Sequence, residues 1–199
     1  MEYLVLSMLW IGWCAVHSAL ISLRVTDYLK ARLGPSYRFY RLFYNALALL
    51  SLFPVVSYGA ELKGQALFVW DGPWAILRLA LAACAAGLFV AGGRKYDMLQ
   101  MLGLRQIISG KAHSALTAAG TIDTTGILGL TRHPWYLAAI IFIWASSREM
   151  YASTFVVNII VTVYVALGTV LEERKLVAEF GEEYRAYQRR VPMLLPLKW

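Results

Sequence analysis

The chain has 199 residues, of which 59% are hydrophobic and only 16% are charged. Soluble domains carry about 25% charged residues, and here the apolar residues form long blocks, so a purely soluble protein is excluded and an integral membrane protein is predicted. The net charge of +7 comes from basic residues that flank the apolar blocks, as in membrane proteins, and no nucleic-acid partner is expected.

Five apolar segments are expected to form membrane-spanning helices. They lie at approximately residues 3–23, 42–60, 74–92, 134–147 and 152–171. The first lacks a basic leader and an A-x-A cleavage motif, so it is interpreted as a retained span. A charged segment at residues 171–192 has the apolar spacing of an amphipathic helix. We therefore predict an all-α integral membrane protein with five transmembrane helices and a C-terminal amphipathic helix, folded as one domain over residues 1–199.

The basic residues predict how the helices are oriented. Sixteen of the 19 lysines and arginines lie in the segments 24–41, 94–133 and 174–198. If five helices cross the membrane, these three segments face the same side, and basic segments favour the cytoplasmic side. We therefore expect the N-terminus outside and the C-terminus, with all three basic segments, in the cytoplasm.

The short fourth segment begins with the sequence TRHPWY, which places an arginine and a histidine directly against an apolar helix. Fourteen residues form a helix of about 21 Å, whereas the hydrocarbon core is about 30 Å thick. Pro134 suits the first turn of a helix. Arg132 and His133 are therefore expected at a cytoplasm-facing pocket mouth, with Tyr136 one turn inside. The alternative is a basic flank, a helix cap and an interfacial aromatic residue, respectively.

The C-terminal segment contains an apolar stripe with helical spacing, formed by Leu176, Phe180, Tyr184, Tyr187 and Val191. One turn before the stripe lies Glu172, and a carboxylate on an apolar face at a membrane is costly unless it is paired. Glu172 is therefore predicted to belong to a site, and Glu173, about 100° further round the helix, to be exposed. The alternative is a salt bridge from Glu172 to Arg132 or Lys175.

Other polar residues are candidates for a role near a substrate. His17 lies in the first span, where an ionisable residue raises the question of function, although a hydrogen-bonded core histidine is the alternative. Asp97 and Arg105 flank an apolar run after the third span. The two cysteines, Cys14 and Cys84, lie in apolar segments, and no CxxC or HExxH pattern occurs, so no metal site is predicted.

Two segments carry a resemblance to a known family. The sequences TTGILGLTRHPWYLAA and EERKLVAEFGEEYRAYQRRVPMLLP, separated by an apolar span, resemble the C-terminal core of the isoprenylcysteine carboxyl methyltransferase superfamily, which phospholipid N-methyltransferases share. The likeness covers about residues 113–196. In the N-terminal half, HSAL, YRFYRLFYN and YDMLQMLGLRQI are more similar to the NnrU and methanethiol S-methyltransferase branch.

This resemblance implies S-adenosylmethionine (SAM) as the cofactor, bound by residues 94–199, with residues 1–93 as a three-helix N-terminal part. The positions that match the family's cofactor site are Thr121, Ile122, Asp123, Leu128, His133, Pro134, Trp135, Tyr136 and Glu172. The resemblance also implies a bacterial inner membrane, with the active site facing the cytoplasm.

One departure from the family pattern bears on the substrate. Isoprenylcysteine enzymes hold the substrate carboxylate with an arginine four residues before the cofactor-binding glutamate, where this chain has Gly168. The expected function is therefore in-line transfer of a methyl group from SAM to a small thiol or a lipid-soluble acceptor, with His17, Asp97 or Arg105 assisting at the acceptor. Two alternatives are an NADPH-dependent enzyme like the sterol reductases, which carry a similar RHP-x-Y segment, and a non-catalytic NnrU-like membrane factor.

Overall fold

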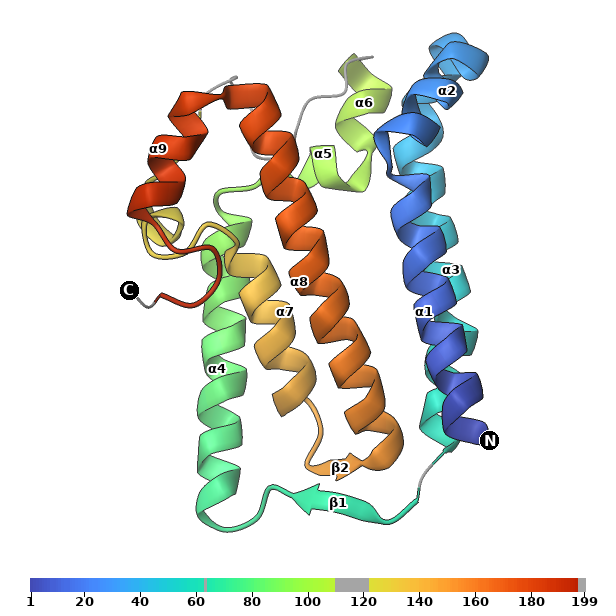
Figure 1. Ribbon diagram of the computed structural model, residues 1–199, viewed down its shortest axis with the longest axis vertical. Helices are drawn as coiled ribbons and strands as arrows, with labels where there is room; N and C mark the ends of the chain where they lie inside the picture. Colours follow the sequence, from blue (N-terminus) through green and yellow to red (C-terminus); the bar gives the residue numbers. More distant parts are fainter. Residues whose placement is uncertain (63, 110–121, 197–199) are drawn as a thin grey trace.

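The computed structural model describes residues 1–62, 64–109 and 122–196, and this part of the chain is mostly helical (Figure 1). In chain order the elements are α1 (Glu2–Leu20), α2 (Leu23–Leu33), the 3-10 helix η1 (Gly34–Phe39), α3 (Tyr40–Glu61), β1 (Ala66–Val69), α4 (Pro73–Gly93), α5 (Met98–Leu102), α6 (Leu104–Ser109), the 3-10 helix η2 (Gly126–Gly129), α7 (Pro134–Ala145), β2 (Glu149–Tyr151), α8 (Ala152–Phe180) and α9 (Glu182–Arg190).

Four helical stretches are long and apolar enough to cross a membrane, namely α1, the stretch from α2 to α3, α4 and α8. They correspond to four of the five predicted spans, and the protein is therefore an integral membrane protein. The fourth predicted span corresponds to α7, which is apolar but has only 12 residues, a length of about 18 Å. A fifth crossing by α7 stays a prediction.

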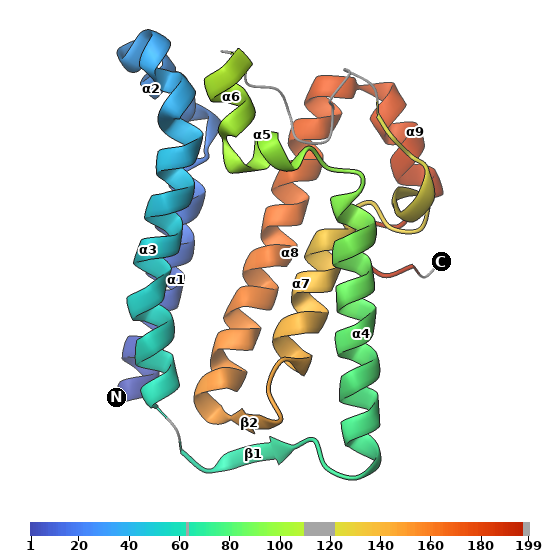
Figure 2. The ribbon, with the colours of Figure 1, turned by 180° about the vertical axis from the view of Figure 1, so that it is seen from behind.

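Helix α8 lies between two helix pairs, α1 with α3 on one side and α4 with α7 on the other (Figures 1 and 2). On the first side, Leu6 and Trp10 of α1 and Val55 of α3 form a buried cluster against Val157 and Val161 of α8. Helices in a membrane are held together by close van der Waals packing of this kind. One face of α8 therefore contacts α1 and α3, and another face contacts α7.

Small residues allow α4 and α7 to approach closely. Ala85 of α4 and Ala138 of α7 are fully buried, and Gly92 of α4 lies against the indole of Trp135. The indole N–H of Trp135 donates a hydrogen bond to the carbonyl of Phe89 (3.0 Å). Contacts between small residues are typical of packed membrane helices, and here they fix the start of α7 against α4.

Replacing Gly92 by alanine is expected to destabilise the protein by about 1–3 kcal/mol, the usual cost of overpacking. A Cβ at this position would clash with Cδ1 of Trp135, so the indole would have to move and give up its hydrogen bond. Thermal unfolding in detergent, followed by tryptophan fluorescence, should show a lower melting temperature. Gly87→Ala is the matched control in the same helix, because a Cβ there meets nothing within 4 Å. Equal melting temperatures for the two variants would contradict this packing.

Two features of the fold were not predicted. The region between the first two predicted spans is occupied mainly by α2 and η1, and the Ser22 hydroxyl caps α2 by accepting a hydrogen bond from the backbone N–H of Val25 (3.4 Å). At the opposite end, β1 pairs antiparallel with β2, beside an ion pair between Arg148 and Asp71 (2.5 Å). Strands of three and four residues are too short to show the alternation that predicts a strand.

The two ends of the bundle differ. Helices α2, α6 and α9 lie at one end, and the N-terminus and both strands lie at the other (Figure 1). Parts of all three basic segments are thus at the same end, as the predicted orientation requires. The side of the membrane that this end faces stays a prediction.

Candidate functional site

The start of α7 is tied to the C-terminal segment of the chain. The backbone N–H groups of Arg132 and His133 donate hydrogen bonds to the carbonyls of Pro192 (3.0 Å) and Met193 (3.2 Å). As predicted, α7 begins at Pro134, and His133 has the non-helical conformation expected before a proline. The side chains of Arg132 and His133 are buried as a result.

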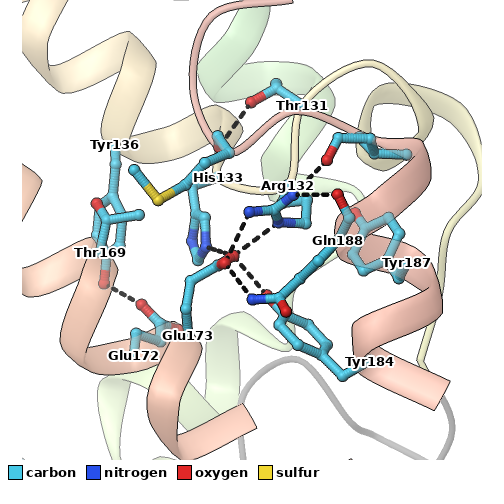
Figure 3. A network of polar contacts seen from close by, with 12 residues as sticks. Thr131, Arg132, His133, Tyr136, Thr169, Glu172, Glu173, Tyr184, Tyr187 and Gln188 are labelled. Carbon is cyan, nitrogen blue, oxygen red and sulfur yellow. Dashed lines mark hydrogen bonds and ion pairs between the residues drawn. The ribbon is translucent and has the colours of Figure 1, made fainter. Parts of the chain in front are cut away.

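Arg132 and Glu173 form a bidentate ion pair at the centre of this region (Figure 3). Nε and Nη2 of Arg132 donate to Oε1 and Oε2 of Glu173, both at 2.7 Å. Nη1 donates to the backbone carbonyls of Gln188 (3.1 Å) and Val191. The two side chains are only 8% and 9% exposed, so each charge depends on the other for compensation.

Three more donors surround the carboxylate of Glu173. Oε1 contacts Nε2 of His133 (2.9 Å) and the hydroxyl of Tyr184 (2.8 Å), and Oε2 accepts a hydrogen bond from Nε2 of Gln188 (2.6 Å). Because a carboxylate only accepts, Nε2 of His133 carries the proton in this contact. Burial and the neighbouring Glu173 raise the pKa of Tyr184, so its hydroxyl stays protonated and donates.

The prediction that Glu173 is exposed is therefore wrong. Glu173 lies three residues and Glu172 four residues before Leu176, so the two carboxylates flank the apolar stripe on either side. The stripe is also divided between two helices, because the chain turns at Gly181, whose φ is +57°, between α8 and α9. This turn brings Tyr184 back over Glu173.

The predicted alternative for Glu172 is also wrong. Arg132 pairs with Glu173 instead, and no ion pair joins Glu172 to Lys175 in the described part of the chain. Glu172 is half-buried, and its Oε2 accepts a hydrogen bond from the hydroxyl of Tyr136 (2.5 Å). No other described residue donates to it. Glu172 is thus a half-buried carboxylate that is held by one neutral donor.

The aromatic surroundings of Glu172 include one residue that the sequence interpretation missed. The ring of Tyr136 stacks on the imidazole of His133, with centroids 5.4 Å apart. Tyr96, just after α4, meets Trp135 edge-on at 5.0 Å. Burial and the negative charge of Glu172 raise the pKa of Tyr96, so its phenol stays neutral near this carboxylate. Tyr96 is the first residue of the stretch YDMLQMLGLRQI, but the sequence pattern assigned it no role at the site, because only the packing of α4 on α7 brings it here.

A pocket opens on the other side of the ion pair, beside α9. It is lined by Ile122, Asp123, Leu128, Arg132, Leu176, Phe180, Tyr184 and Tyr187. Ile122, Asp123 and Leu128 are predicted cofactor residues. The hydroxyl of Tyr187 donates to the carbonyl of Leu128 (2.6 Å), and burial raises the pKa of Tyr187 to about 12. The phenol therefore stays protonated and holds the segment before α7 against α9.

Asp123 supplies a negative charge to this pocket. Its Oδ1 accepts a hydrogen bond from the backbone N–H of Thr125 (2.8 Å), and its Oδ2 pairs with Nζ of Lys95 (2.9 Å). These interactions, the backbone one first, lower the pKa of Asp123 to about 2. The carboxylate therefore stays ionised at neutral pH.

The predicted cofactor residues lie on both sides of the Arg132–Glu173 pair. Tyr136 and Glu172 lie on one side, as Figure 3 shows, and the pocket with Ile122, Asp123 and Leu128 lies on the other. His133 and Pro134 lie between them at the start of α7, and Trp135 packs against α4. Thr121 lies outside the described residues. Binding of a cofactor by any of these residues stays a prediction.

The three residues predicted to act at the acceptor do not form one cluster. Asp97 and Arg105 form an ion pair with each other (2.5 Å), and Oδ1 of Asp97 caps α5 by accepting a hydrogen bond from the backbone N–H of Gln100 (3.0 Å). His17 lies elsewhere, in α1, where its Nε2 is 2.7 Å from the hydroxyl of Tyr44 of α3.

Comparison with known proteins identifies relatives with named activities. Residues 22–191 match the family model described as "Protein of unknown function (DUF1295)". The methanethiol S-methyltransferase of Pseudomonas deceptionensis is 34% identical over 110 residues, which are 55% of this chain and 41% of that protein. Methanethiol S-methyltransferase 1 of Bradyrhizobium diazoefficiens is 35% identical over 97 residues, 49% of this chain and 33% of that protein.

A more distant match comes from the other branch of the superfamily. The protein-S-isoprenylcysteine O-methyltransferase of Schizosaccharomyces pombe is 33% identical over 78 residues, 37% of this chain and 32% of that protein. The matched regions thus span less than half the length of these three relatives. No solved structure matches the chain.

These matches confirm the resemblance to the isoprenylcysteine carboxyl methyltransferase superfamily and to its methanethiol S-methyltransferase branch. The family model covers nearly the whole chain, including α7, α8 and α9, which carry the site. The protein therefore belongs to the DUF1295 family.

Proposed function

We propose that this protein is a membrane methyltransferase that uses SAM and methylates a small thiol or another lipid-soluble acceptor. Its similarity to proteins named methanethiol S-methyltransferase and isoprenylcysteine O-methyltransferase supports a methyltransferase. One observation carries the proposal: the carboxylate of Glu172 is half-buried, and no cation of the described residues pairs with it.

The residues around Glu172 fit the chemical groups of SAM. SAM carries a sulfonium and an ammonium, and a carboxylate flanked by tyrosine rings attracts such cations. Tyr136 fixes the carboxylate by a hydrogen bond of 2.5 Å, and the neutral phenol of Tyr96 lies near it. We infer that Glu172 binds the ammonium group and that Tyr136 and Tyr96 line the positively charged part of the cofactor.

The other residues of the site have supporting roles in this proposal. Arg132 and Glu173 neutralise each other and fasten α9 over the start of α7, so they shape the site and exclude water. Nε2 of His133 donates to Glu173, so Nδ1 could donate to the cofactor's carboxylate only if the ring held a second proton. We therefore assign His133 first to the positioning of Glu173. Ile122, Leu128 and Tyr187 offer an apolar and aromatic wall for the adenine.

When bound, SAM supplies an activated methyl group, and the protein contributes alignment and the exclusion of water, which account for most of the rate in such transfers. Gly168 lies one turn before Glu172 and offers no charge to a substrate carboxylate. This favours an uncharged acceptor, in line with the thiol in the names of the bacterial relatives. We place the site on the cytoplasmic side of a bacterial inner membrane.

The proposal can be tested with purified protein in lipid nanodiscs. Radiolabelled SAM is offered with methanethiol, longer thiols, phosphatidylethanolamine or a prenylcysteine analogue in parallel. We expect label in the thiol product and little in the prenylcysteine product. Tight binding of NADPH without binding of SAM would contradict the proposal and favour a reductase. No binding of either would favour a non-catalytic membrane factor.

A further inference from the structure

We propose that the acceptor is a small neutral thiol that binds beside Gly168 of α8, and that His17 accepts the proton from its sulfur. This inference rests on the proposed function, and it assigns the acceptor site and its base. Three observations carry it, namely the surroundings of His17, the space beside Gly168 and the pairing of the other two candidate residues.

His17 is part of a polar aromatic cluster at the contact of three helices. Its imidazole stacks on Trp13 of α1, with centroids 4.8 Å apart, and its Nε2 is 2.7 Å from the hydroxyl of Tyr44 of α3. Tyr164 of α8 meets the imidazole edge-on at 6.3 Å and shares a hydrogen bond with Ser18 (3.0 Å). Polar groups inside a membrane bundle are costly and often serve a function.

Neutral and basic titratable groups surround His17. They are Tyr44 and Arg41 of α3, Tyr164 of α8 and Cys14 of its own helix. No carboxylate of the described residues pairs with His17. Both ring nitrogens lie near the hydroxyl of Tyr44, Nε2 at 2.7 Å and Nδ1 at 3.0 Å. When that hydroxyl accepts a hydrogen bond from the ring N–H, the other nitrogen is unprotonated and can receive a proton.

The helix α8 connects this cluster with the proposed cofactor site. Tyr164, Gly168 and Glu172 follow one another at intervals of four residues, so each is turned only about 40° from the one before it. Tyr164 also lies within electrostatic range of Tyr136, the partner of Glu172. The two clusters are therefore about 12 Å apart along one side of α8.

Gly168 leaves room between the two clusters. A Cβ at this position would meet no atom within 4 Å. A small acceptor in this space would lie between the imidazole of His17 and a methyl donor held at Glu172. A carboxylate-bearing acceptor would find no basic residue at this position, because Gly168 has no side chain.

The other two candidates are engaged elsewhere. Asp97 and Arg105 neutralise each other at 2.5 Å, and Asp97 also caps α5. Their contacts explain the fold of the segment after α4. His17 is therefore the one of the three candidates that no ion pair of the described residues neutralises.

The proposed step is balanced in atoms and electrons. The S–H proton of the thiol moves to a ring nitrogen of His17, and a lone pair of the resulting thiolate forms the new S–CH3 bond. The bond between the methyl carbon and the sulfonium sulfur breaks, and its electron pair stays on the cofactor sulfur. The products are a thioether, S-adenosylhomocysteine and a proton, which His17 releases to water.

The first test compares two thiols in the His17→Gln variant. With an aliphatic thiol such as butanethiol, the rate should fall by about 10²- to 10⁴-fold, the usual contribution of a general base. With trifluoroethanethiol, a small thiol that is already mostly ionised in the mildly alkaline buffer used for both assays, the rate should stay close to that of the wild type. An equal loss of methylation rate with both thiols, or no loss with either, would overturn the role of His17.

The second test measures binding without turnover. Titration of butanethiol into protein saturated with S-adenosylhomocysteine should show binding to the wild type and none to Gly168→Leu. Gly87→Leu is the matched control, because a Cβ at Gly87 also meets nothing within 4 Å. Equal thiol binding by the two leucine variants would overturn the assigned acceptor site.

Titration with SAM separates this inference from the proposed function. All three variants should bind SAM like the wild type, which also shows that they are folded. A wild-type protein that does not bind SAM would refute the proposed function itself. If the wild type binds SAM and His17→Gln methylates butanethiol normally, only the present inference fails.

Discussion

Replacing Glu172 by glutamine is expected to weaken SAM binding by about 2 kcal/mol or more, roughly 30-fold in Kd. The substitution keeps the size of the side chain and its ability to accept a hydrogen bond from Tyr136 but removes the negative charge that the proposal assigns to the ammonium group. Isothermal titration of SAM into purified protein in detergent measures the change.

Two further variants make this result specific. Glu179→Gln removes a carboxylate from an exposed position in the same helix, so it should bind SAM like the wild type. Tyr136→Phe removes the hydrogen bond that Tyr136 donates to Glu172, the only one from a described residue, so it should weaken binding by a smaller factor. A Glu172→Gln variant with unchanged affinity would contradict the assignment of this carboxylate to the cofactor.

Replacing Glu173 by alanine is expected to have the largest effect on stability, a loss of about 3–5 kcal/mol in the free energy of unfolding. The variant would leave the guanidinium of Arg132 buried without a counter-charge and would remove the acceptor for Tyr184 and Gln188. Helix α9 would also lose the contacts through which Glu173 links it to the start of α7. Thermal unfolding in detergent, followed by the fluorescence of the seven tryptophans, measures the effect.

A double-mutant cycle shows whether the ion pair is the cause. Arg132→Met and Glu173→Leu should each be strongly destabilising, whereas the double variant should lose less than the sum of the two, because no unpaired charge is left buried. Additive effects, or single variants that unfold at the temperature of the wild type, would show that the pair does not hold the site together.

The sequence predicted the long helices and the start of α7 well, because both depend on local signals. Long apolar blocks marked α1, α3, α4 and α8, and a proline after two polar residues marked the first turn of α7 at Pro134. The apolar stripe drew attention to Glu172, whose hydrogen bond with Tyr136 places it within the candidate site. These features follow from the periodicity of a single helix.

The sequence did not predict features that depend on contacts between distant segments. The partner of Arg132 is Glu173, 41 residues away, and the turn at Gly181 decides which carboxylate α9 covers. Helical spacing alone could not make this choice, because both glutamates lie within one turn of the apolar stripe. Tyr96 and the strand pair were missed for the same reason, since they owe their places to α4–α7 packing and to a short pairing between loops.

The most direct test of this account is a titration of SAM and, separately, of NADPH into the purified wild-type protein and the Glu172→Gln variant. We expect the wild type to bind SAM in a 1:1 complex and not NADPH, and the variant to bind SAM at least ~30-fold more weakly with the same melting temperature. Absence of SAM binding by the folded wild type, or equal binding by the two proteins, would contradict it.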